Sequence, residues 1–422
     1  MVKVAVFGGG WAGCAAAIEA RKAGADVELV ERTDMLLGTG LVGGIMRNNG
    51  RFTVAEELKA MGANELIDLI DNNSLHKNID FPGHEHSSLY NVAIIESEVR
   101  DLVHKMGIKT IFQMRGKEVR LKDNKVTEVL LDDGSKMKAD AFIDATGSAG
   151  PIENCTKHGN GCVMCIYRCP TFGGRISISE KAGVKESQGK KEDGSTGAMS
   201  GSCKLIKESL AKDIQDRLKN AGVCIVPVPK DLQKKDALEL KVCQQYAHKE
   251  YQENIILLDC GNSKMMTAYY PLSVLRNIPG FEKARFADPI SAGIGNSMRL
   301  MSSVPRDNTM QVQNIDNLYC AGEKAGFLVG HTEAICTGTL AGYNAVKKVK
   351  GEKPLEISRN LAIGEGIAFN LEQMQTEEGL QNRYTFSGTI LFERIKELDL
   401  YTTDIGDIKA RVEENGLTNI YK

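Results

Sequence analysis

The first thirty residues constrain the fold of this chain more than any other stretch. Residues 2–7 are apolar and strand-like, and residues 11–23 carry the small side chains of a closely packed helix. Between them lies the pattern Gly-x-Gly-x-x-Gly, formed by Gly8, Gly10 and Gly13. The first glycine permits a tight turn, the second lets a pyrophosphate approach the backbone, and the third allows helix and strand to pack closely. This segment therefore predicts a phosphate-binding turn at the start of a helix.

An acidic residue completes this unit. Residues 26–31 are predicted to form a second strand, which ends on Glu31. An acid about 20 residues after the glycines binds ribose hydroxyls, while the helix N-terminus stabilises the phosphates through its N–H groups and dipole. The strand–helix–strand order thus indicates a Rossmann-like domain with a bound dinucleotide.

Two later fragments indicate which dinucleotide is bound. A predicted β-meander over residues 117–145 runs directly into Thr146-Gly147, and a later strand ends in Glu323, an acid that suits the hydroxyls of a ribitol chain. A helix begins at about His331, and its N-terminus would stabilise negative charge on a flavin pyrimidine. The predicted cofactor-binding residues are Gly8, Gly10, Gly13, Glu31, Arg47, Thr146, Gly147, Glu323, Gly330 and Thr332.

These fragments together resemble the FAD-dependent oxidoreductase superfamily with the glutathione-reductase-like fold. The resemblance rests on FGGGWAGCAAA, LLGTGLVGGI, AFIDATG and NLYCAGEKAGFLVGHTEAICTGTLAGYNA. The last fragment and FGGR (172–175) are also similar to the glucose-inhibited division protein A family and the folate-dependent tRNA methyltransferases. The resemblance implies FAD as the cofactor and a two-domain fold with the isoalloxazine ring at the domain interface.

The order of the predicted elements suggests the domain organisation. Residues 1–150 form the first part of the FAD-binding domain, and residues 306–350 return to it. Residues 151–305 form an inserted α+β substrate domain that contains a cysteine cluster. Residues 351–422 form a mainly helical segment that caps the site or mediates dimerisation. The predicted fold class is therefore α/β, with a β-meander in the Rossmann-like domain.

Four of the eleven cysteines lie close together, at Cys155, Cys162, Cys165 and Cys169. The final spacing, Cys-x2-Cys-x3-Cys-Pro, resembles the end of a bacterial ferredoxin run. The odd cysteine count and the length of the chain argue against a secreted disulfide framework. Because the run begins soon after Gly147, we expect it to lie near the flavin.

Several chemistries fit this cysteine run. A [4Fe–4S] cluster held by the four thiolates would let the flavin split a two-electron reaction into single-electron steps. A redox dithiol of Cys162 and Cys165 would exchange two electrons with the flavin or attack a substrate. A structural zinc ion would use four thiolates, although the usual paired Cys-x2-Cys spacing is missing. Unligated thiols are the fourth alternative, and the sequence leaves all four open.

His331 and Arg175 are further candidates for catalysis. His331 would act as an acid or base or hold the cofactor, although a polar residue at a helix start needs no such role. Arg175 and Arg306 would bind an anionic substrate, although such arginines are more often solvated or paired. Arg47 and Arg51 flank the glycine-rich stretch and are candidates for contacts with cofactor phosphates.

Charge and hydropathy limit the classes of binding partner that we expect for this chain. The net charge is −2, which argues against nucleic acid as a partner. No apolar run approaches the roughly 20 residues that span a bilayer, so we expect a cytoplasmic protein with no membrane partner. A small-molecule substrate is the expected partner, with an electron-transfer protein and a second copy of the chain as further candidates.

Three functions follow from these features. The leading hypothesis is an FAD-dependent oxidoreductase that moves two electrons between a small substrate and FAD, with the cysteine run as iron–sulfur relay or dithiol. The first alternative is a flavin- and folate-dependent RNA-modifying enzyme, which a basic surface stripe beside the flavin would support. The second alternative is a non-enzymatic flavin redox sensor or electron-carrier subunit that docks a partner through an exposed apolar helix face.

Overall fold

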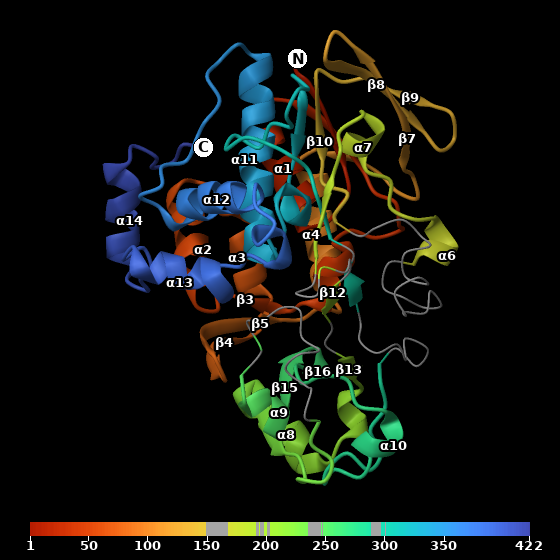
Figure 1. Cartoon of the computed structure of the whole chain (residues 1–422), viewed down its shortest axis with the longest axis vertical. Helices are drawn as coiled ribbons and strands as arrows, with labels where there is room; N and C mark the ends of the chain where they lie inside the picture. The colour runs from red at the N-terminus through yellow and green to blue at the C-terminus, as the bar shows by residue number, and fades with distance from the viewer. Residues whose placement is uncertain are drawn as a thin grey trace.

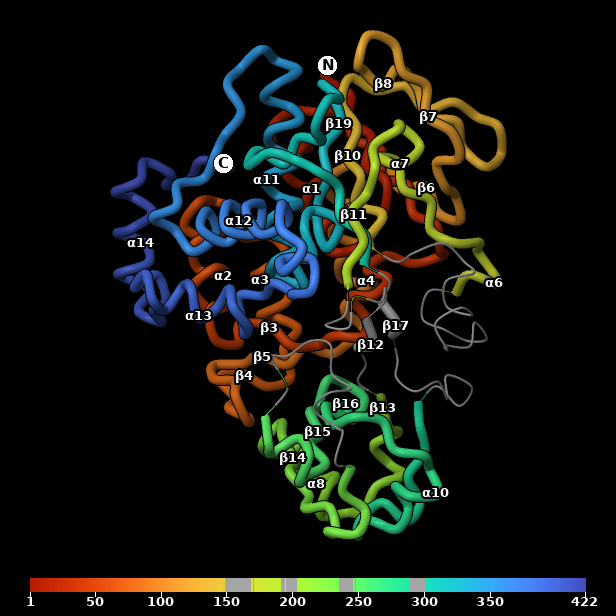
Figure 2. Tube along the Cα trace, viewed as in Figure 1, coloured from red at the N-terminus to blue at the C-terminus, as the bar shows by residue number. Residues whose placement is uncertain are grey.

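The structure is a computed structural model of the whole chain (Figures 1 and 2). It describes residues 1–148, 168–190, 194, 198–200, 203–234, 246, 248–287, 297–299 and 301–422. In Figure 1 segments from both ends of the chain build the larger body, and residues 203–234 and 248–287 form a smaller unit below it. None of the helices in the described ranges is long and apolar enough to cross a membrane.

A five-stranded parallel sheet forms the centre of the larger body. Its strands lie in the order β19-β10-β1-β2-β6. Their bounds are β1 Lys3–Phe7, β2 Asp26–Val30, β6 Lys109–Ile111, β10 Ala141–Asp144 and β19 Leu318–Cys320. All neighbouring pairs are parallel, and β1, β10 and β19 are almost wholly buried, as is usual for a sheet covered by helices. These features confirm the predicted Rossmann-like α/β fold class.

Two helices cross closely beside this sheet. They are α1 (Trp11–Lys22) and α11 (His331–Val349). A Cβ atom at Gly338 would lie 2.1 Å from the Ala12 carbonyl oxygen, and one at Gly342 would lie 2.2 Å from that of Ala16. The four-residue spacing of these glycines therefore lets the backbones touch and brings the start of α11 to the glycine loop that precedes α1.

An antiparallel meander precedes strand β10. The sequence predicted a meander over residues 117–145, but the structure ends it at Met137 and places residues 141–144 in the parallel sheet as β10. The meander consists of β7 (Gly116–Lys122), β8 (Lys125–Leu131) and β9 (Lys136–Met137). Asp123 and Asn124 connect the first two strands with φ angles of 49° and 58°. Positive φ at both central residues is typical of the type I′ turns that join two-residue hairpins.

A second, three-stranded antiparallel sheet lies between the parallel sheet and the smaller unit. Its strands are β3 (Ile45–Met46), β4 (Ser74–Phe81) and β5 (His84–Tyr90). Three helices accompany it, namely α2 Gly50–Ala60, α3 Glu65–Asn72 and α4 Ile95–Lys105. Apolar residues on one side of these helices, including Leu58, Ile67 and Val99, join the main core.

The smaller unit has a four-stranded antiparallel sheet in the order β13-β16-β15-β14. The strands are β13 Cys203–Leu205, β14 Val223–Pro227, β15 Asn254–Cys260 and β16 Asn262–Met265. Helix α8 (Lys212–Ala221) packs on one face through Ile214 and Leu218. The short helices α9 (Glu250–Glu253) and α10 (Leu272–Leu275) complete the unit.

The central strand β15 shows how the smaller unit joins the larger body. Ile255 and Leu257 lie in the unit's own core. Ile256, Leu258 and Cys260, which alternate with them, lie in the core of the larger body. Since neighbouring side chains of a strand point to opposite faces, this sheet is buried on both sides.

The C-terminal helices pack on the larger body rather than extending from it (Figure 1). They are α12 (Ala362–Gln373), α13 (Thr389–Glu397) and α14 (Ile405–Glu414). The Glu57 carboxylate of α2 accepts hydrogen bonds from the backbone N–H groups of Ala362 and Ile363, at 2.8 and 3.0 Å, where α12 begins.

The remaining short elements are α6 Cys169–Phe172, α7 Ile178–Lys181, β11 Ser187–Gln188, β12 Ala198–Ser200, β17 Ser297–Arg299, β18 Ser302–Ser303 and the 3-10 helices η1 Gly38–Val42, η2 Lys207–Ser209, η4 Gly322–Ala325 and η5 Gly379–Gln381.

Candidate functional site

The glycine loop between β1 and α1 has the geometry that a pyrophosphate requires. Gly8 has a φ of +100°, and a Cβ atom there would lie 2.2 Å from the Ala145 carbonyl oxygen. A Cβ at Gly13 would lie 1.7 Å from the Gly8 carbonyl oxygen, so helix and strand pack as the motif predicts. At Gly10 a Cβ would meet nothing within 4 Å, and no side chain caps α1. The N–H groups at the start of α1 therefore face open space that suits an anion.

Glu31 lies at the end of β2, directly beside this loop. Its carboxylate accepts a hydrogen bond of 2.7 Å from the Gly9 N–H and bonds from the Thr33 N–H and hydroxyl at 2.7 and 3.0 Å. These contacts hold the carboxylate at the place where a dinucleotide ribose is bound in Rossmann-like domains. The role of Glu31 as a ribose ligand remains a prediction.

The ends of β10 and β19 bring further predicted residues to the same edge of the sheet. The Asp144 carboxylate accepts bonds from the N–H and the hydroxyl of Thr146, at 3.2 and 2.7 Å, and so shapes the turn into Gly147. The Ser148 hydroxyl donates a 2.7 Å hydrogen bond to Glu323. Because carboxyl ends of parallel strands meet at one edge, these residues and the glycine loop surround a common region, where ligands bind in such folds.

Beneath this edge lies a buried charge network that the sequence reasoning missed. The Lys324 ammonium is fully buried and lies 3.3 Å from Asp144 and 2.5 Å from Glu186. Arg175 lies 3.2 Å from Glu186. Burial alone raises the pKa of Glu186, but the positive charges of Lys324 and Arg175 outweigh burial and lower this pKa to about 2. The only signal in the sequence was the position of Asp144 and Lys324 next to the predicted residues.

His331 begins α11 and lies in a small aromatic cluster. Its Nδ1 atom is 2.9 Å from the Tyr90 hydroxyl, and its ring lies 5.9 Å from the ring of Trp11. A Cβ atom at Gly43 would lie 1.7 Å from the His331 ring, so the glycine-rich stretch packs directly on the histidine. The aromatic partners place a titratable group at the start of α11, where the sequence predicts the flavin.

Gly330 and Thr332 flank His331. Gly330 has a φ of +146° and stands before the first residue of α11, where any Cβ would collide with Glu333 and Arg51. Thr332 is fully buried, and its hydroxyl lies 3.5 Å from the Met46 sulfur. Both residues therefore contribute to the packing at the start of α11. Their contact with a cofactor remains a prediction.

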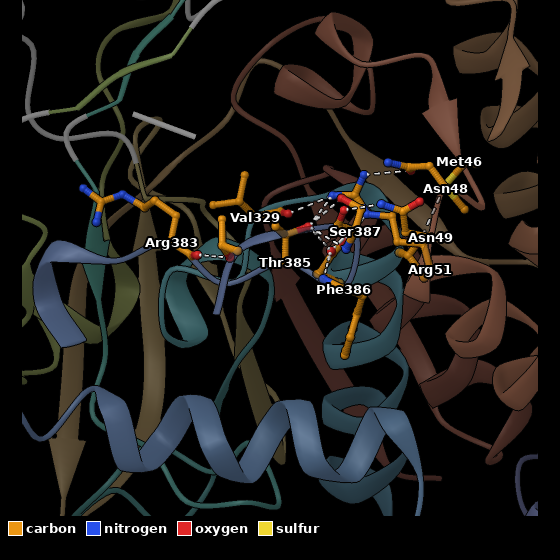
Figure 3. Close-up of polar contacts among 12 residues, drawn as sticks. Met46, Asn48, Asn49, Arg51, Val329, Arg383, Thr385, Phe386 and Ser387 are labelled. Carbon is orange, nitrogen blue, oxygen red and sulfur yellow. Dashed lines mark hydrogen bonds and ion pairs between the residues drawn. The ribbon is translucent and has the colours of Figure 1, made fainter. Parts of the chain in front are cut away.

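Arg51 forms a buried ion pair with Glu333 at this helix start. Figure 3 shows the same arginine beside Val329 and Thr385. The Arg51 Nε lies 3.0 and 3.1 Å from the two carboxylate oxygens. The same guanidinium donates to the Val329 carbonyl at 3.0 Å and to the Thr385 hydroxyl at 2.9 Å. Glu333 also accepts from the Phe386 N–H at 2.8 Å. The C-terminal segment is thereby tied to the start of α11.

All four arginines predicted to meet ligands have carboxylates or carbonyls as partners, and those of Arg51 are given above. Arg47 lies 2.7 Å from Glu56 and 2.6 Å from Asp71, on α2 and α3. Arg175 pairs with Glu186, as described above. Arg306 is almost fully buried and donates to the Ala325 carbonyl at 2.7 Å and to others nearby. These contacts give Arg47 and Arg175 structural partners and add no support for their predicted ligand contacts.

The cysteine run lies almost entirely outside the described residues. This holds for Cys155, Cys162 and Cys165. Cys169 is described and partly buried, with its sulfur 3.9 Å from an Arg32 nitrogen. Within the described ranges no three His, Cys, Asp or Glu residues are placed to hold a metal ion. The cluster, dithiol and zinc interpretations therefore remain predictions.

Comparison with known proteins identifies the family. The family model for glucose inhibited division protein A matches residues 3–269 and 252–353. The chain belongs to this family. It is thus a member of an FAD-dependent flavoprotein family, as the sequence resemblance predicted, and FAD is the cofactor that the glycine loop and the open start of α1 suit.

Curated relatives of this family member carry tRNA-related names. The chain is 28% identical over 175 residues to a tRNA uridine 5-carboxymethylaminomethyl modification enzyme, MnmG 1, of Fusobacterium nucleatum, covering 38% of the chain and 26% of the relative. It is 36% identical over 92 residues to a methylenetetrahydrofolate--tRNA-(uracil-5-)-methyltransferase, TrmFO, of Enterococcus faecalis, covering 22% and 20%. The matches thus span about a quarter of these relatives or less.

A solved structure shows the same fold over nearly the whole chain. The structure of Aquifex aeolicus GidA in its form II crystal has a TM-score of 0.66 and 17% identity. It covers 98% of this chain and 76% of the GidA chain. At this identity the likeness establishes the fold alone.

The names of the relatives correct one expectation. The net charge of −2 argued against nucleic acid as a partner, and this expectation was wrong for a chain of this family, because curated relatives are named for their action on tRNA. The physical reason is that a net charge sums over the whole chain and conceals how charge is distributed.

Proposed function

We propose that this chain is an FAD-dependent enzyme that modifies a nucleoside of tRNA. The observation that carries the proposal is the family match over residues 3–353, combined with a glycine loop and helix start that fit a dinucleotide. This was the first alternative in the sequence analysis, and the curated relatives favour it over the small-molecule reaction.

The described residues can be given roles in this proposal. Gly8, Gly13 and the start of α1 would hold the FAD pyrophosphate, Glu31 a ribose, and Glu323 the ribitol chain. Bound FAD would supply the redox chemistry. His331, whose Nδ1 is fixed by the Tyr90 hydroxyl, would hold or move a proton at its other ring nitrogen.

The distribution of charge supports a nucleic-acid partner. The described residues of the smaller unit, 203–234, 246 and 248–287, contain 12 lysines and arginines against 8 aspartates and glutamates, a net charge of +4. The remainder of the chain has a net charge of −6. A basic unit attached to an acidic body would attract a polyanion to one part of the surface.

Two binding measurements test this proposal. We expect the purified chain to bind FAD, and the FAD complex to bind tRNA with an affinity whose logarithm falls linearly with the logarithm of salt concentration. An uncharged-backbone analogue of the same sequence should bind far more weakly. FAD binding without any tRNA binding would contradict the proposal.

A small-molecule FAD oxidoreductase is the second candidate. What supports it is the run of four cysteines at Cys155, Cys162, Cys165 and Cys169, whose spacing fits redox or cluster chemistry next to a flavin. In that case Cys162 and Cys165 would be the redox pair, whose disulfide would take two electrons and two protons from reduced FAD and become the dithiol, or the four cysteines would hold a cluster that takes the electrons one at a time. An anaerobic absorption spectrum and an iron assay would decide between dithiol and cluster.

A further inference from the structure

A pair of lysines connects the smaller unit to the glycine-rich stretch, residues 38–44. Lys204 on β13 and Lys264 on β16 lie directly opposite each other in the antiparallel register. The Lys264 ammonium donates to the carbonyls of Val42 and Gly43 at 2.8 and 2.7 Å. The Lys204 ammonium donates to the Leu41 carbonyl at 2.7 Å. Three consecutive carbonyls thus accept from two lysines of another unit.

The other side of the same stretch is bound by the larger body. The Tyr90 hydroxyl donates to the Gly40 carbonyl at 3.2 Å, and the Tyr90 N–H donates to the Gly44 carbonyl at 3.0 Å. Gly43 contacts the His331 ring so closely that a Cβ would lie 1.7 Å from it. Residues 40–44 are therefore held between the two lysines on one side and Tyr90 and His331 on the other.

Two cationic side chains are an unexpected pair at this interface, where backbone carbonyls hold each ammonium group. Like charges opposite each other on neighbouring strands are destabilising, and burying an ammonium away from water adds to the cost. Lys264 is 6% exposed. Lys204 and Lys264 lie on the same face of the sheet as Ile256 and Leu258 of β15, and these two residues are part of the main core. An apolar pair at Lys204 and Lys264 would suit this interface better if packing were the only requirement.

We propose that Lys204 and Lys264 are positioning residues that fix residues 41–43 against His331, so that the smaller unit sets the shape of the flavin site. The inference rests on the proposed function, because it takes the start of α11 to be the flavin-binding region. In this proposal the lysines do not touch the flavin themselves, and they influence its site through the backbone carbonyls of residues 41–43. Movement of the smaller unit, for example when it binds a polyanion, would be transmitted to His331 through these carbonyls.

Substitution of the lysines tests the inference. We expect Lys264→Met to weaken FAD binding by about tenfold or more, because two carbonyls lose a charged donor, and Lys204→Met to weaken it less. Hydrogen exchange of the amides in residues 38–44 should accelerate in both variants. Lys264→Arg, which keeps the positive charge and supplies several N–H donors, should restore much of the affinity and the visible circular dichroism of bound FAD.

Lys207→Met is the matched control. Lys207 lies in the same unit, but its ammonium binds Asp259 at 2.5 Å rather than the glycine-rich stretch. Equal loss of FAD affinity in Lys207→Met and Lys264→Met, or unchanged exchange of residues 38–44 in Lys264→Met, would overturn the inference. If Lys264→Met does not fold, Lys204→Met decides by the same measurements. Failure of the wild-type chain to bind FAD would contradict the proposed function instead, and the exchange rates would still show whether the lysines fix the stretch.

Discussion

Replacement of Arg51 by methionine should destabilise the larger body strongly. Arg51 and Glu333 have side chains that are 5% and 0% exposed, so the substitution leaves a carboxylate buried without its cation. Removing one member of such a pair costs about 3–5 kcal/mol. Thr385 and Phe386 still donate to Glu333 in the variant, which keeps the expected loss within that range. Total stabilities of about 5–15 kcal/mol make a loss of this size easy to measure.

The assay is urea unfolding of the flavin-free protein, with a double substitution as the decisive comparison. Arg51→Met combined with Glu333→Gln removes both charges, and we expect it to be about 2 kcal/mol more stable than Arg51→Met alone. Arg115→Met is the control, because its pair with Asp132 is partly exposed and contributes about 1 kcal/mol or less. The reasoning would be refuted if Arg51→Met were no more destabilising than this control, or if the double variant were no more stable than Arg51→Met.

Three further predictions concern the site. Gly13→Ala should abolish FAD binding, measured by flavin fluorescence, because its Cβ would lie 1.7 Å from the Gly8 carbonyl. Gly43→Ala should displace the His331 ring and shift the histidine resonances in NMR spectra, and unchanged resonances would contradict the contact. The lowered pKa of Glu186, about 2 against 4.5, gives about 3 kcal/mol of stability above pH 4.5 that is lost as the pH falls through 2. Comparing urea midpoints with those of Glu186→Gln should show the difference shrinking over that interval.

The sequence predicted the parts of the fold that depend on local pattern. The glycine turn, the meander before Thr146 and the helix at His331 all follow from short motifs with definite backbone requirements. The pairing of Arg51 with Glu333 could not be predicted, because it joins residues 282 positions apart. The contacts of Lys204 and Lys264 with residues 41–43 could not be predicted either, because they depend on the pairing of β13 with β16, which places the two lysines opposite each other.

The smaller unit shows why the net charge of the whole chain gave a wrong prediction about nucleic acid. A net charge of −2 is true of the whole chain, yet the smaller unit carries +4. Domain boundaries decide which charges act together, and these boundaries follow from sheet pairing between distant residues, which the local sequence pattern does not determine. The cysteine run could not be assigned for a different reason. Its spacing is compatible with an iron–sulfur cluster, a zinc ion, a dithiol or unligated thiols, and these differ in the distances between the four sulfur atoms of Cys155, Cys162, Cys165 and Cys169.

The contact between Arg51 and Thr385 has a consequence for the order in which the protein forms during synthesis. The larger body needs strands from residues 3–144, strand β19 near residue 320 and a segment near residue 385, so most of the chain must leave the ribosome before it can close. The smaller unit has its own core within residues 203–287. Its sheet nevertheless places Ile256 and Leu258 in the core of the larger body, so the last segments to be synthesised complete the packing of both units.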